Sequence, residues 1–198
     1  MIPQGLPLRD LDQTVAARFS NATKELGQSG VRLYDEPLPL LDDMVRVNSK
    51  ATFAVAESYS IHRERLAIRA AEYDPFVRSR IELGRTLSAA DYMAMLRDRT
   101  TLVRAMDARL SDLDALVLPT TPIVAPTIAE VSSSEVLTAK NSLILRNPAL
   151  VNFFDLCAIS LPLPRVGGLP VGLMLVARNG HDRRLFRMAA AVERLFAA

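Results

Sequence analysis

Cysteine and histidine are scarce in this 198-residue sequence, which has one cysteine, Cys157, and two histidines, His62 and His181. A single cysteine cannot form an intrachain disulfide, which is typical of a protein from a reducing compartment. Cys157 lies in an apolar run with no histidine near it in sequence, so we interpret it as a buried, unreactive thiol. Neither histidine has a second ligand at metal-binding spacing. The sequence therefore predicts no metal site.

Long hydrophobic runs and an excess of charge of one sign are also missing. No apolar run reaches the roughly 18 residues that a membrane helix needs. The first ten residues have neither the basic start nor the apolar segment of a secretion signal. A net charge of +2, from 24 basic and 22 acidic residues, gives no field that attracts nucleic acid or an anionic membrane. We expect a soluble, cytoplasmic protein with neither of these as a partner.

Glycine-rich cofactor loops and nucleophile motifs do not occur in the sequence. The glycines at 167, 168 and 172 lack the spacing of a dinucleotide or phosphate loop, and no lysine follows them. The serine run Ser132–Ser134 has no flanking glycines, and we interpret it as a surface loop. Lys140 does not make it catalytic, because a Ser–Lys pair requires a buried lysine with a lowered pKa. We predict no catalytic residue and no cofactor for this chain.

Hydrophobic residues make up 49% of the sequence, enough for a folded core in one domain or in part of a larger one. Apolar spacing of three and four predicts helices, and short apolar runs predict strands. Helices are expected over 11–26, 76–83, 88–113 and 182–196 and in a long region from Pro37 to about 72, and strands over 31–34 and 115–118. Residues 119–147 are expected to be irregular. This pattern predicts an α/β architecture in which helices cover a sheet.

The most informative stretch runs from Arg146 to Ala177, RNPALVNFFDLCAISLPLPRVGGLPVGLMLVA. Pro148 suits the first position of a helix, which we expect to end near Cys157. The apolar runs 158–163 and 172–177 then predict an antiparallel hairpin joined by the loop 164–171. Pro162 places the first of these strands at a sheet edge or at a strand end.

The same stretch resembles the amidase signature hydrolases, whose last segment reads R-x-T-x-x-x-N-x-x-G-L-P-A-I-S-V-P and then G-L-P-V-G-L-Q-L. The matching positions here are Arg146, Asn152, Leu156, 158–162 and 168–175, and the upstream run DALVLPTTP at 114–122 resembles a further family segment. Three positions depart from the family pattern: Pro148 replaces Thr, Asp155 replaces Gly and Cys157 replaces Pro.

The resemblance implies an α/β fold, namely the C-terminal part of an amidase-signature α/β/α sandwich with a mixed β-sheet. Residues 1–198 would then be the C-terminal portion of a single amidase domain, with the N-terminal catalytic half absent. Members of this family hydrolyse a carboxamide C–N bond through an acyl-enzyme, using one lysine and two serines that lie in that half. The implied partners are a small-molecule amide substrate and either the missing half or a second copy, because a half-sheet leaves an edge and apolar helix faces exposed.

Four residues are candidates for substrate binding. Arg146, Asn147 and Asn152 align with the start of the family's substrate-facing helix, where donors would orient a polar acyl group. Arg80 falls where glutaminyl-tRNA-forming amidotransferase A subunits place an arginine for a substrate carboxylate. An ion pair on a helix surface is the alternative for each. Leu145, standing where those A subunits have Asp, favours a general amidase over an amidotransferase-like relative, and a non-catalytic binding or assembly module remains a further alternative.

Overall fold

The computed structural model describes residues 1–164 and 168–197, so positions 165–167 of the predicted loop 164–171 lie outside the described residues. The chain divides into two compact units. One, called the sheet unit here, comprises Met1–Leu41 and Val103–Ala198, and the other, the helical unit, comprises Asp42–Leu102. The division falls within two helices, α2 (Leu40–Val47) and α5 (Ala89–Arg109). Within the described residues, no helix combines the length and the apolar character that crossing a membrane requires.

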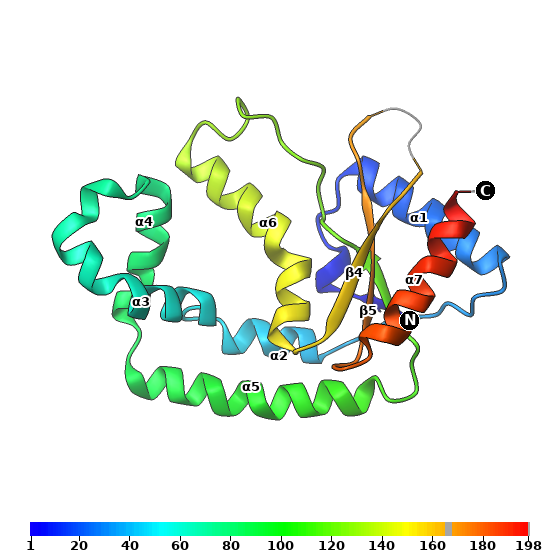
Figure 1. Ribbon diagram of the computed structural model, residues 1–198, viewed down its shortest axis with the longest axis horizontal. Helices are drawn as coiled ribbons and strands as arrows, with labels where there is room; N and C mark the ends of the chain where they lie inside the picture. The colour runs from blue at the N-terminus through cyan, green and yellow to red at the C-terminus, as the bar shows by residue number, and fades with distance from the viewer. Residues whose placement is uncertain (165–167, 198) are drawn as a thin grey trace. The chain divides into compact units, whose positions relative to one another are not determined.

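Both parallel and antiparallel strands occur in the sheet unit, as predicted (Figure 1). β1 (Ile2–Gln4) pairs in parallel with β2 (Asp35–Pro37). β5 (Gly172–Ala177) lies between β3 (Leu116–Pro119) and β4 (Cys157–Pro162) and is antiparallel to both. The predicted hairpin is therefore confirmed, and β4 is an edge strand that ends at Pro162.

Helices cover this sheet on both faces. α1 (Gln13–Gln28) and α7 (Asp182–Phe196) lie on one side of β5 in Figure 1, and α6 (Ser134–Phe153) lies on the other. The layer of α1 and α7 packs Phe19 and Leu185 against Leu173 and Leu175 of β5. Asp12 caps α1, and its carboxylate also accepts a hydrogen bond from the Val124 amide. The α/β/α layering that the family resemblance implies is confirmed.

The helical unit contains α3 (Phe53–Arg69) and α4 (Pro75–Glu82), with the 3-10 turns Ala70–Glu72 and Leu83–Thr86 after them. Asp74 caps α4, as expected. Gly84 is the point of closest packing, because an added Cβ would lie only 2.5 Å from the Val55 carbonyl oxygen and 2.6 Å from Tyr59 Cβ. This glycine lets the backbone turn after α4 rest directly on α3.

Several predicted elements were wrong in their bounds. The region 119–147 is not irregular throughout, because α6 begins at Ser134 with Ser133 as its cap and contains Pro148 within it. A proline inside a helix removes only its own N–H donor and kinks the helix, and here Leu150 and Phe153 after it are buried and hold the chain in place. The long helix expected after Pro37 is divided into α2 and α3, and 31–34 is not a strand; β2 follows it instead.

Helix α6 ends earlier than predicted, and Asp155 is the reason. This residue adopts φ of 53°, the left-handed conformation that glycine usually supplies after a helix. The Leu156 amide donates to the Val151 carbonyl (3.1 Å) and the Asp155 amide to the Asn152 carbonyl (3.4 Å), the two hydrogen bonds of a Schellman motif. Asp155 therefore adopts the conformation that glycine favours, at a position where the resembling family has glycine.

Candidate functional site

Asn147 is the only polar residue in the buried core of the described residues, with 0% exposure. Its amide nitrogen Nδ2 donates to two backbone carbonyls, that of Pro7 at 3.1 Å and that of Pro119 at 2.7 Å. These carbonyls belong to the segment after β1 and to the end of β3. Asn147 thus ties α6 to two other segments of the sheet unit, because buried carbonyls without a donor are costly.

Arg146 contacts the same N-terminal segment from the next position of α6. Only 12% of its side chain is exposed, and its guanidinium donates to the carbonyls of Pro7 (3.4 Å) and Arg9 and lies 3.6 Å from the Asp10 carboxylate. Its Nε also approaches Asn147 Oδ1 at 3.5 Å. Burial lowers the pKa of Arg146, with Asp10 opposing that effect. The structure therefore brings Arg146 and Asn147 together, with their donors directed at backbone.

The other two predicted residues have different surroundings. Asn152 is exposed near the end of α6. Arg80 belongs to the helical unit, where its guanidinium lies over the ring of Phe76 at 5.6 Å from the centroid. A cation–π contact of this kind stabilises a helix surface without any ligand. Substrate binding by the four residues stays a prediction.

Three positions from the quoted motifs meet at one end of the three-stranded sheet, a meeting that the sequence did not predict. Thr120 follows β3 and Ser160 lies on β4, and their hydroxyl oxygens are 2.6 Å apart. We call them the hydroxyl pair. Gly172 begins β5 beside them, and an added Cβ would lie 2.5 Å from Ser160 Oγ and 2.6 Å from Thr120 Oγ1. The hydroxyl pair therefore requires glycine at 172. The only sequence signal is that all three residues belong to the motifs, since 40 residues separate the two hydroxyls.

The hydroxyl pair can donate and accept hydrogen bonds. A serine or threonine nucleophile needs an adjacent base. Within residues 1–164 and 168–197, neither hydroxyl contacts a lysine or histidine, and the hydroxyls bond to each other. In the same residues, no group of three His, Cys, Asp or Glu side chains is placed to hold a metal ion. The described geometry thus places two hydroxyl groups together as hydrogen-bonding groups at this end of the sheet.

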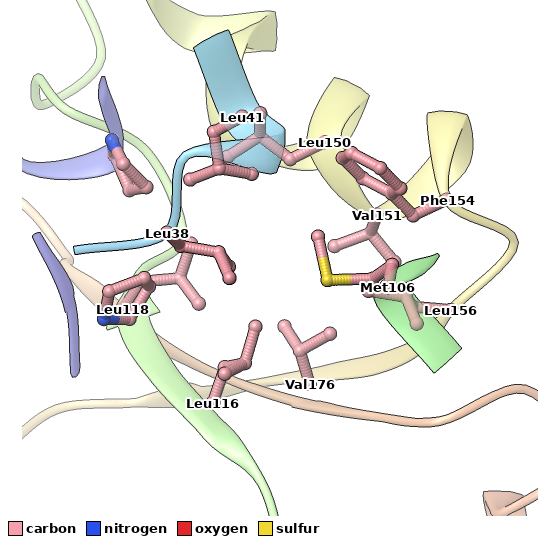
Figure 2. Close-up of a pocket in the computed structure, with 12 residues that line it drawn as sticks. Leu38, Leu41, Met106, Leu116, Leu118, Leu150, Val151, Phe154, Leu156 and Val176 are labelled. Carbon is pink, nitrogen blue, oxygen red and sulfur yellow. The ribbon is translucent and has the colours of Figure 1, made fainter. Parts of the chain in front are cut away.

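An apolar cavity lies between α6 and the sheet (Figure 2). Leu150 of α6 and Phe154, the residue after this helix, line one side of the cavity. Leu118 and Val176 line it from the sheet, and Met106 lines it from α5. Its volume is about 20 Å³, and every lining side chain is hydrophobic. Ligand pockets usually measure about 300–1,000 Å³. This cavity is a small packing void and not a substrate pocket.

Comparison with known proteins identifies the family. The amidase family model matches residues 2–186. The chain belongs to the amidase family. Among curated proteins, it is 30% identical to the 2-amino-5-chloromuconic acid deaminase of Comamonas testosteroni, over 94% of this chain and 40% of that protein. It is 28% identical to the A subunit of the glutamyl-tRNA(Gln) amidotransferase of Thermotoga maritima, over 98% of this chain and 44% of that protein.

Solved structures show the same relation between this amidase-family chain and larger proteins. The Kluyveromyces lactis allophanate hydrolase superposes with a TM-score of 0.84 at 26% identity, covering 98% of this chain and 31% of that one. A crystal structure described as an amidase superposes with a TM-score of 0.82 at 24% identity, covering 98% and 45%. The chain therefore spans less than half the length of these amidase-family relatives.

Proposed function

We propose that this chain is the C-terminal portion of an amide hydrolase and supplies scaffold and part of the substrate-pocket wall. The observation that carries the proposal is the family match over residues 2–186 in a chain that spans only 40% and 44% of the two curated relatives. In this proposal the catalytic lysine and two serines lie in the remaining part of the amidase domain.

The hydrolysis that the family resemblance implies proceeds in two steps. A serine oxygen attacks the amide carbonyl, a second serine and a lysine pass its proton to the leaving nitrogen, and the C–N bond breaks to release ammonia or an amine. Water then hydrolyses the acyl-enzyme to the acid. Within the described residues, no serine hydroxyl bonds to a lysine, and Lys50 is paired with Asp91 at 2.5 Å. This geometry supports the proposal that the catalytic lysine and serines lie outside this chain.

Within this proposal, Arg146 and Asn147 act by positioning. Asn147 holds the end of β3 against α6 through the Pro119 carbonyl, and the hydroxyl pair follows directly at Thr120. Arg146 holds the N-terminal segment through the carbonyls of Pro7 and Arg9. Asn152, exposed on α6, is the candidate for direct contact with the acyl group. Arg80 is proposed for a substrate carboxylate, as the resemblance to amidotransferase A subunits suggests. Leu145, at the position of the A subunits' Asp, favours hydrolysis over transamidation.

Ammonia release from aliphatic and aryl carboxamides tests the proposal. We would compare the 198-residue chain with a version extended upstream through its reading frame. Hydrolysis by the extended chain alone is the expected result. Hydrolysis by the short chain would contradict the proposal that the catalytic residues lie outside it, and Ser132–Ser134 would then be the candidates for the nucleophile. Inactivity of both chains on the whole panel would favour a non-catalytic assembly module.

A further inference from the structure

The turn that joins β5 to α7 contains an asparagine followed by a glycine. The His181 amide donates to the Arg178 carbonyl at 3.1 Å, which places Asn179 and Gly180 at the two central positions of a tight turn. Gly180 has φ of 74°, a conformation that glycine adopts without strain, and both central residues are exposed. An asparagine before a glycine is also the asparagine whose side chain the following backbone nitrogen attacks most easily, because glycine has no side chain to block the approach.

The backbone nitrogen of Gly180 is accessible for this attack. In the part of the chain that the structure describes, the Gly180 N–H donates to no acceptor. A Cβ added to Gly180 would have no atom within 4 Å, so the turn is surrounded by open space on that side. The nucleophile of the reaction is therefore neither held by a hydrogen bond nor covered by a neighbouring side chain.

Asn179 also joins this turn to a second turn at the same end of the sheet. Its amide nitrogen Nδ2 donates to the Asp155 carbonyl at 2.6 Å. Asp155 is the left-handed residue between α6 and β4, so one side chain connects the turn before β4 with the turn after β5 (Figure 1). We call this contact the Asn179 clasp. The clasp requires an N–H donor at position 179, because a carboxylate can only accept hydrogen bonds.

We propose that Asn179 is a site of spontaneous deamidation and that the reaction opens the Asn179 clasp. The Gly180 nitrogen gives up its proton and bonds to Asn179 Cγ, which closes a five-membered succinimide ring. The side-chain nitrogen takes up that proton and leaves as ammonia. Water then adds to one of the two ring carbonyls and breaks its C–N bond, which gives aspartate or isoaspartate at position 179.

This reaction needs only water and is independent of the proposed function. The side chain must leave Asp155 before Cγ reaches the backbone nitrogen, and exposed hydrogen bonds of a turn open far more often than those of a helix. The product lowers the net charge of +2 by one unit and leaves the Asp155 carbonyl without its donor. Isoaspartate also adds a methylene group to the backbone between β5 and α7, which displaces the turn that His181 and Arg178 close.

Peptide mapping by mass spectrometry tests the proposal on the folded 198-residue chain. At mildly alkaline pH, Asn179 should convert to aspartate and isoaspartate roughly tenfold or more faster than Asn141. Asn141 is the matched internal control, because a small residue, Ser142, follows it but both lie within α6, where the helix holds the backbone amides. Asn147 is a second control, since Pro148 after it has no N–H to lose.

Two variants at position 179 separate the reaction from its effect. Asn179→Gln keeps a side-chain amide, but backbone attack on the longer side chain must close a six-membered ring, which is slow, so conversion at this position should disappear. Asn179→Asp supplies the deamidated side chain from the start. Its unfolding temperature should lie below that of fresh wild type and match that of wild type converted to aspartate.

Three results would overturn the proposal. The first is conversion of Asn179 no faster than that of Asn141 in the folded chain. The second is conversion of Asn179 only in urea, because the clasp then keeps the site closed in the folded protein. The third is an Asn179→Asp variant as stable as wild type, which would show that opening the clasp has no effect. None of these measurements uses a carboxamide substrate, so the proposed function is tested separately.

Discussion

Strands β4 and β5 belong to one hairpin, yet they have opposite environments. β5 has hydrogen-bonded neighbours on both sides and helices over both faces, and five of its six residues, 173–177, are buried. Within the part of the chain that the structure describes, β4 has one neighbouring strand, and only Leu161 is buried among its six residues. The two sequences already differ in this sense, since GLMLVA is a continuous apolar run and CAISLP alternates with small or polar residues. The inner strand of the hairpin, β5, is therefore paired on both sides, whereas the outer strand, β4, is paired on one side among the described residues.

The largest expected effect comes from truncating the inner strand. Leu173→Ala removes a side chain with 0% exposure from β5, and we expect it to lower the free energy of unfolding by about 2–5 kcal/mol. Ala158→Ser on β4 should change it by less than about 0.5 kcal/mol. Urea unfolding of both variants checks the contrast. Equal losses would mean that β4 is as well covered as β5.

Asn147→Ala probes the layer that covers β5 from α6. It leaves the carbonyl of Pro119 without its donor and removes one of the two donors to the carbonyl of Pro7, which Arg146 also contacts. An unsatisfied buried group costs about 1–3 kcal/mol, and we expect a loss in that range by thermal or urea unfolding. The matched control, Asn152→Ala on the exposed side of the same helix, should lose less than about 0.5 kcal/mol. Similar losses for the two variants would contradict a positioning role for Asn147.

Gly172→Ala tests the point where the two strands and β3 meet. The new methyl group overlaps both hydroxyls, and overpacking of this kind costs about 1–3 kcal/mol. Adding Ser160→Ala removes one of the two overlapping oxygens, so the double variant should be more stable than the sum of the two single losses predicts. A double-mutant cycle of unfolding free energies measures this coupling. Strict additivity would show that the hydroxyl pair does not require glycine at 172.

The smallest expected effect is a pH dependence at the far end of β5. Arg178, which follows this strand, donates to both oxygens of Asp107 at 2.8 and 2.6 Å, and this hydrogen bonding lowers the pKa of Asp107. A lowered folded-state pKa stabilises the fold above the ordinary Asp pKa of about 3.9, and the contribution is lost as the pH falls through the lower folded value. The advantage of wild type over Asp107→Asn in thermal unfolding should therefore shrink between about pH 7 and about pH 3. An advantage that does not change with pH would contradict an ionic contribution.

The hairpin and the last helix were predictable because their signals are local. Gly172–Ala177 and Asp182–Phe196 have the predicted bounds, since an uninterrupted apolar run and a stripe at helical spacing each specify one element. The first part of α6, from Ser134 to Asn147, was missed because Pro148 suits a helix start equally well. Only the buried contacts after Pro148 show that the helix passes through it. Local sequence propensity could not decide whether the helix begins at Ser134 or at Pro148.

The candidate site also has a part that the sequence predicted and a part that only the fold shows. Arg146 and Asn147 were identified as important from their motif, but their partners at Pro7, Arg9 and Pro119 lie at distant positions in the sequence that only the fold brings near. The hydroxyl pair was missed because neither hydroxyl has a chemical signature of its own. Its existence depends on the strand order β3-β5-β4, which sets the ends of three separate segments side by side.

The sequence by itself determined the family, the α/β class, the hairpin and the continuous apolar character of β5, because each depends on the order of residues within a short segment. Only the tertiary structure decided that β5 is the central strand and that Asn147 serves two backbone carbonyls. These features depend on which segments lie next to each other. Buried polar groups must find partners wherever the fold places them, and a local pattern does not specify those partners.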